Sequence, residues 1–199
     1  GIADIIRDCK LYIQGIMKKI DTYLIKWYGP FETRKDMKDW EASRPETFNL
    51  YVFQAKQKTG KDRFYCGMAF KQSIGKRMSN HNHHIHDFED DRFSLQIWIG
   101  TIVNKRASES EVRICENIIT SVLANIGVGE KYLENRTNKK PPVNDVYIFN
   151  EWLRENGSYI LNRKRNSVPA TIPEAMVYYS EPQTLFAADK LKYKGKLSL

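Results

Sequence analysis

The sequence predicts an α+β fold, in which a small, mainly antiparallel central sheet is flanked by helices and carries extensions at both ends. Three observations support this prediction. Two short β-favouring runs are joined by a turn, a longer β-favouring run follows them, and helical patterns lie before and after these runs. With 199 residues and 41% hydrophobic content, the chain can bury the core of one domain of ordinary size.

The N-terminal part of the chain predicts a helix. Apolar residues in the range 2–27 recur at intervals of three and four, which is typical of an amphipathic helix, here ending near Gly29-Pro30. Residues 31–47 are mostly charged and fit a short helix or a loop.

The centre of the chain changes to strand patterns. Residues 50–55 and 63–68 favour strands, and the turn at 58–61 between them predicts a hairpin. Residues 71–82 predict a helix, and residues 93–103 predict a longer strand.

The second half begins with a helix signal. Ser108 followed by Glu111 resembles a capping box, which predicts a helix to about Asn125. Residues 145–155 predict a further helix, and residues 175–179 predict a strand.

Three segments follow from these patterns. Residues 1–47 form an N-terminal helical region, residues 48–156 form the core, and residues 157–199 form a C-terminal extension that packs on the core.

Charge and cysteine usage narrow the class of partner. The net charge of +8 favours polyanions such as nucleic acid. No apolar run approaches the roughly 18 residues of a membrane span, and the N-terminus lacks a signal pattern, so we expect no membrane partner. The three cysteines lie in apolar runs, which predicts reduced thiols and a cytoplasmic protein.

Five residues of one stretch suit attack on a phosphate diester. Tyr51 and Tyr65 lie on the two strands of the predicted hairpin, Gly67 follows, and Arg77 and His81 lie four apart on a predicted helix. An arginine stabilises charge on phosphoryl oxygens, and a tyrosine or histidine can accept a proton from the attacking water.

A carboxylate for a metal ion is found further along the chain. Glu116 lies at the edge of the apolar stripe of its predicted helix, so we expect it to point toward the sheet. A glutamate in that position is costly without a partner, and a divalent cation is one such partner.

Together these residues resemble the GIY-YIG endonuclease superfamily, named for two tripeptides on neighbouring strands. Asn49-Leu50-Tyr51 and Tyr65-Cys66-Gly67 stand in the equivalent places. The segment from Gly75 to His81 resembles the following helix, with its functional arginine and histidine, and Glu116 matches the glutamate that holds the metal. Lys140-Pro141-Pro142-Val143-Asn144 resembles the stretch ending in an active-site asparagine, with Asn138 and Asn135 as alternatives.

The resemblance implies an endonuclease with a GIY-YIG-like core that uses one Mg²⁺, or Mn²⁺ in its place, to hydrolyse phosphodiester bonds. DNA is the expected substrate and RNA stays open. Tyr51 would activate or position the water beside Tyr65, Arg77 would stabilise the phosphate, and His81 would assist proton transfer. Asn144 would support the site. The size resembles restriction endonucleases of the family, and cutting both strands would call for a homodimer.

Further basic residues are candidates for phosphate contacts. These are Lys76, Arg163, Lys164 and Arg165, although a solvated charged surface explains them equally well. We interpret His83, His84 and His86 as surface residues rather than as a zinc or nickel site, because their spacing suits a metal poorly.

The competing class is a non-catalytic nucleic-acid-binding module on this or another α+β fold. In that interpretation the two tyrosines are half-buried strand aromatics, and Glu116 is a helix residue with a salt-bridge partner.

Overall fold

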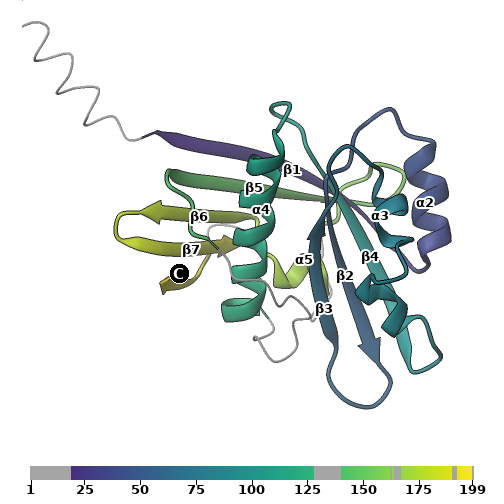
Figure 1. Ribbon diagram of the computed structural model, residues 1–199. Coiled ribbons are helices and arrows are strands. Elements are labelled where there is room, and N and C mark those ends of the chain that lie inside the picture. Colours follow the sequence, from purple (N-terminus) through teal and green to yellow (C-terminus); the bar gives the residue numbers. More distant parts are fainter. Residues whose placement is uncertain (1–18, 128–139, 162, 164–166, 190–191, 199) are drawn as a thin grey trace, which may run out of the picture.

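The computed structural model describes residues 19–127, 140–161, 163, 167–189 and 192–198 (Figure 1). Eight strands form one sheet: β1 (Ile20–Phe31), β2 (Leu50–Gln57), β3 (Arg63–Met68), β4 (Phe93–Ile102), β5 (Asp145–Leu153), β6 (Ala175–Ser180), β7 (Gln183–Asp189) and β8 (Lys192–Ser198). Their order in the sheet is β3-β2-β4-β1-β5-β6-β7-β8. The β1–β5 pair is parallel, and the other neighbouring pairs are antiparallel.

Helices cover both faces of this sheet (Figure 1). The helical segments are α2 (Arg34–Ala42), α3 (Ile74–Met78), the 3₁₀ helix η1 (His84–Phe88), α4 (Glu109–Val122), the π-helical turn η2 (Leu123–Gly127) and α5 (Val168–Thr171). One buried cluster joins α4 and α5 to one face, and a second joins α2, α3 and η1 to the other.

Strand β2 is buried on both faces because helices cover each side. Leu50 and Val52 belong to the α4 cluster, whereas Tyr51 and Phe53 belong to the cluster with α2, α3 and η1. Covering on both sides explains why this strand reads as an almost continuous apolar run. Tyr51 therefore lies on the face covered by α2, α3 and η1, whereas Glu116 belongs to α4 on the opposite face, and β3 is the edge strand of the sheet beside β2.

Several sequence predictions are confirmed. The α+β class holds, β2 and β3 form the predicted hairpin, and β4 and β6 occupy the predicted strands. Helix α4 begins at Glu109 and is capped by Ser108, whose side chain and that of Glu111 form the predicted capping box. The inward stripe of α4 is fully buried and anchors the helix to the sheet.

Other predictions are wrong. The sheet is not small, since it has eight strands. Residues 20–27 and 145–153 were predicted as helix and are strands β1 and β5, while residues 1–18 of the N-terminal prediction lie outside the described part. The helix predicted for 71–82 is limited to α3.

A period of two decides the outcome in β1 and β5. In β1 every second side chain is fully buried at Tyr23, Ile25 and Trp27. In β5 the buried Ile148 and Trp152 fit the same period of two. Aromatic and β-branched residues fit such a half-covered strand well. Stacking of Trp27 on Trp152, with ring centroids 5.3 Å apart, then joins the two parallel strands.

The strands come from all three segments that the sequence suggested. Strand β1 lies between β4 and β5, and strands β6 to β8 continue the sheet from β5. Within the described residues, no helix is long and apolar enough to cross a membrane.

Candidate active site

The β2–β3 hairpin places Tyr51 and Tyr65 on the same face. Tyr51 pairs with Gly67 and Phe53 pairs with Tyr65, so the two tyrosines are diagonal neighbours. Their ring centroids are 6.0 Å apart, and the two ring planes are nearly parallel. This hairpin therefore brings both phenols together, as the sequence predicted.

Gly67 is required for the position of Tyr51. A β-carbon at Gly67 would lie 2.8 Å from Cε2 of Tyr51, and closer still to Cζ and the phenol oxygen. No side chain other than hydrogen fits there without displacing the ring. The glycine of the Tyr-x-Gly tripeptide thus makes room for the tyrosine of the neighbouring strand.

His83 holds the phenol of Tyr51 from the opposite side. Its Nε2 lies 2.7 Å from the Tyr51 oxygen, and the Ile85 backbone N–H donates to its Nδ1 at 3.1 Å. Since Nδ1 accepts, Nε2 carries the hydrogen in the neutral ring and donates to Tyr51. Burial, followed by the charge of Arg77, lowers the pKa of His83 to about 4, so the ring is neutral at pH 7.

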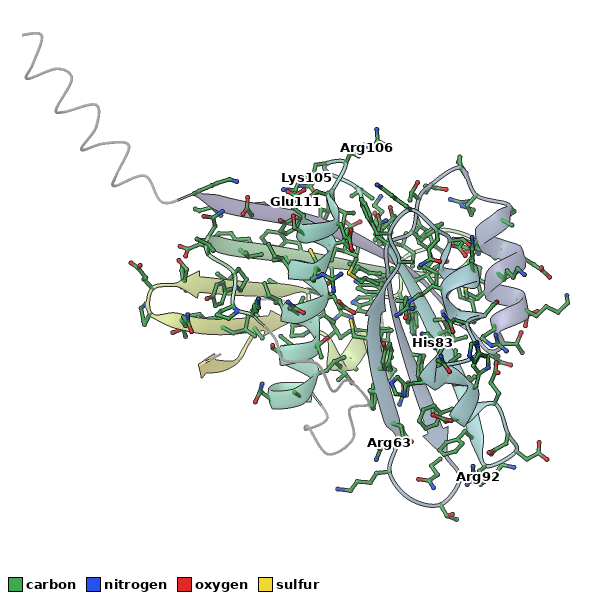
Figure 2. The ribbon with its side chains drawn as sticks, in the orientation of Figure 1. Arg63, His83, Arg92, Lys105, Arg106 and Glu111 are labelled. Carbon is green, nitrogen blue, oxygen red and sulfur yellow. The ribbon has the colours of Figure 1, made fainter. Side chains whose placement is uncertain are left out.

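The histidine beside Tyr51 is therefore His83 rather than His81. His83 is 6% exposed, so its interpretation as a surface residue is wrong. His81 lies exposed in a turn, because α3 ends at Met78 and the four-residue helical spacing from Arg77 does not extend that far. The sequence signal that could have indicated His83 is the pair of apolar residues that follow it, Ile85 and Phe88, both of which are buried in the structure. Figure 2 labels His83, which stands at the start of η1.

Arg77 and Glu116 act on both phenols. Burial raises the pKa of Tyr51, the charges of Tyr65 and Glu116 raise it further, and Arg77 opposes them. Burial and then Glu116 also raise the pKa of Tyr65, against the charge of Arg77 and a hydrogen bond from Tyr51. The charges of Arg77 and Glu116 therefore influence the pKa of both phenols, with opposite signs.

A chain of hydrogen bonds leads to Tyr65. The Ile85 N–H donates to His83, His83 donates to Tyr51, and the remaining hydrogen of Tyr51 is left to serve Tyr65. Tyr51 is 0% exposed, whereas Tyr65, Arg77 and Glu116 are each partly exposed. Of the two tyrosines, Tyr65 is therefore the one that a ligand can contact.

Glu116 is a carboxylate with an unfavourable environment. Burial raises its pKa, while the charges of Arg113 and Arg77 offset part of this effect. Arg113 itself pairs with Glu109 at 3.2 Å, and no described residue forms an ion pair with Glu116. A half-buried carboxylate of this kind suits Mg²⁺, which needs few protein ligands and keeps most of its waters. Among the described residues, no group of three or more His, Cys, Asp or Glu could hold a metal ion.

Helix α3, which carries Arg77, is held at both ends by α2. The buried carboxylate of Glu41 accepts from the backbone N–H groups of Ile74 and Gly75, both at 2.8 Å. Arg34 donates to the carbonyl of Met78 at 3.3 Å and is paired with Glu89 at the end of η1. Neither Glu41 nor Arg34 carried a sequence signal for this role, because both belong to a charged segment of ordinary composition.

Asn144 lies away from this group. Its side chain donates to Asp21 at 2.9 Å, at the start of β1. Tyr51, Ile99, Tyr28 and Leu153 are aligned across four strands, and Asn144 precedes Leu153 by nine residues. At about 3.3 Å per residue this is roughly 30 Å along the sheet. The alternatives Asn135 and Asn138 lie outside the described residues.

Of the described basic residues that the sequence suggested for phosphate contacts, only one lies exposed beside the candidate site. Lys76 is exposed on α3, next to Arg77. The guanidinium of Arg163 is largely buried and paired with Glu174, so it does not present its charge to a phosphate. Lys164 and Arg165 lie outside the described residues.

Comparison of the chain with protein families, with curated proteins and with solved structures found no match.

Proposed function

We propose that this chain is a metal-dependent endonuclease that hydrolyses phosphodiester bonds in nucleic acid, with DNA as the expected substrate. The observation that carries the proposal is that the β2–β3 hairpin places two phenols side by side, while the charges of Arg77 on α3 and Glu116 on α4 act on both phenols. These are the groups that phosphodiester hydrolysis needs.

The arrangement around β2 supports a GIY-YIG-like core. Strands β3, β2 and β4 are consecutive and antiparallel in the sheet, and the tyrosines lie on the central and edge strands of this group. Helices α3 and α4 then supply the arginine and the glutamate, in the order that the resemblance implies.

In the proposed mechanism Tyr65 meets the attacking water. Tyr65 is partly exposed, and the hydrogen bond from Tyr51 stabilises its ionised form. Tyr51, held by His83 and by Gly67, is a positioning residue that keeps this bond directed. The sequence suggested that Tyr51 activates or positions the water. Because Tyr51 is buried and Tyr65 is partly exposed, this role is assigned here to Tyr65.

Arg77 stabilises the phosphate in this mechanism. Its planar guanidinium donates to two phosphoryl oxygens and stays protonated throughout. The same positive charge favours ionisation of both phenols, so one residue serves the phosphate and the proton acceptor.

Glu116 is the residue that would hold the metal ion. A bound Mg²⁺ or Mn²⁺ would stabilise the leaving oxygen and cancel the carboxylate charge that raises the pKa of Tyr65. One such site per chain cuts one strand, so a double-strand break would require two chains, as in a homodimer, or two visits.

A non-catalytic nucleic-acid-binding module is the second candidate. The observation that favours it is the complete burial of Tyr51, which keeps one of the two phenols from the solvent. In that case Arg77 would bind phosphate without hydrolysis.

A plasmid-nicking assay with magnesium or with EDTA separates the two candidates. We expect magnesium-dependent conversion of supercoiled to nicked DNA by the wild-type protein. Arg77→Ala should lower the rate about a hundredfold or more, since one transition-state donor is worth roughly 2.7–4 kcal/mol. Arg92→Ala, which removes an exposed arginine paired with Asp90, is the matched control. Equal nicking with and without magnesium would contradict the proposal.

A further inference from the structure

A second basic feature lies beside the start of α4, away from the candidate active site. It is a cavity of about 510 Å³, formed where the ends of β3 and β4 approach the start of β2. Its polar and charged lining includes Thr47, Asn49, Lys71, Thr101, Lys105 and Arg106. Figure 2 shows Lys105 and Arg106 at this position.

The cavity keeps a positive charge after its ion pairs are taken into account. Glu46 also lines it, but pairs with Arg44 at 2.7 Å. Lys105 pairs with Glu111 at 2.7 Å and lies 4.3 Å from the ring centroid of Tyr23. Lys71 and Arg106 have no carboxylate partner among the described residues, so two positive charges remain.

The cavity and the candidate active site share the same strands. Asn49 lies just before β2, two residues ahead of Tyr51, and Lys71 follows Gly67 by four residues, after the end of β3. At about 3.3 Å per residue, these intervals correspond to roughly 7 to 13 Å. A nucleic-acid strand that reaches Tyr51 and Gly67 would therefore pass close to the cavity.

We propose that this cavity binds a backbone phosphate of the nucleic-acid strand, adjacent to the phosphate at Arg77. The inference rests on the proposed function for the identity of the ligand. Lysine, arginine, asparagine and threonine side chains are the usual partners of phosphate oxygens, and such contacts fix the register of the strand. The site would thus determine where along the strand the cleavable bond lies.

The test is the salt dependence of nucleic-acid binding in EDTA, which prevents metal-dependent cleavage. Fluorescence anisotropy with a short labelled DNA duplex compares the wild type with Lys71→Asn/Arg106→Gln. Asparagine is chosen because Lys71 has a φ of 56°, a left-handed conformation that asparagine tolerates. The control is Lys35→Gln/Arg92→Gln, which also removes two charges but at exposed positions paired with Asp39 and Asp90.

We expect the slope of log K against log salt to become shallower by about one in the cavity variant, since one phosphate contact is lost, and to change less in the control. Equal slopes for the cavity variant and the control would overturn the proposal, even if the wild type nicks DNA. A reduced slope in the cavity variant, together with no nicking by the wild type, would support the cavity and contradict the nuclease. A wild-type protein that binds no nucleic acid would overturn both. Thermal unfolding of both double variants verifies that each is folded.

Discussion

Gly67 and Tyr51 determine the geometry of the candidate site at the scale of single residues. The tyrosine ring occupies the space where any side chain at position 67 would begin. The sequence could predict that these residues matter, because the order of Tyr51, Tyr65 and Gly67 is visible in it. It could not predict that the glycine accommodates the tyrosine, because that contact depends on the register of two strands.

Gly67→Ala should destabilise the fold by roughly 1–3 kcal/mol, since an added methyl group overpacks a closed site. The same change in a Tyr51→Ala background should cost much less, because the ring it collides with is gone. Denaturant unfolding of the wild type, both single variants and the double variant measures this coupling. Additive free energies in the double variant would show that the two residues do not collide.

The buried imidazole of His83 makes stability depend on pH. The pKa of His83 is about 4 in the folded protein, against an ordinary value of 6.5. Above pH 6.5 the ring is neutral in both states and contributes no pH dependence. As the pH falls from 6.5 to 4, the unfolded state binds a proton that the folded state does not, so stability decreases by roughly 3 kcal/mol.

His83→Gln should therefore show a smaller loss of unfolding free energy between pH 6.5 and pH 4 than the wild type. His81→Gln is the control, because that ring is exposed and should leave the pH profile unchanged. Identical profiles for the His83 variant and the wild type would mean that His83 is not buried as a neutral ring.

At the scale of elements, the position of Arg77 depends on a helix of only five residues. So short a helix is not stable alone and needs tertiary support. Glu41 supplies it by accepting two backbone N–H groups, and Arg34 supplies it at the other end. The sequence indicated a helix around Arg77, but not its length or the residues that hold it.

Glu41→Ala should leave two buried donors without an acceptor and cost roughly 1–3 kcal/mol. Hydrogen exchange at the amides of Ile74 and Gly75 should become faster, and any cleavage activity should fall, because Arg77 loses its orientation. Asp39→Ala, on the same helix but exposed and paired with Lys35, should change neither. Unchanged protection of the two amides in Glu41→Ala would contradict this role.

The sequence was least able to predict whether the segments of β1 and β5 form strands or helices. Strands β1 and β5 carry apolar residues that fit a helical stripe as well as a period of two. Their pairing with each other, which joins residues more than a hundred positions apart, decides for the strand. The hairpin of β2 and β3 was predictable because its pairing is local.

At the scale of the whole molecule, the sheet explains which candidate residues meet. Tyr51 and Tyr65 come from neighbouring strands, while α3 and α4 cover opposite faces of the sheet and carry Arg77 and Glu116, whose charges act on both phenols. Asn144 and Arg163 were placed by local pattern alone, and the sheet order puts them in other environments. Helix phase could predict that Glu116 points inward, because α4 is long and strongly amphipathic.

The proposed function depends most on Glu116 holding a divalent metal ion. Single-turnover cleavage of DNA across a magnesium titration tests it most directly, with Glu116→Gln compared with Glu109→Gln. Glu109 lies on the same helix, exposed and paired with Arg113. We predict that the wild type and Glu109→Gln reach the same saturating rate, and that Glu116→Gln is slower by about a hundredfold or more. A Glu116→Gln variant with the wild-type rate and magnesium dependence would contradict the account.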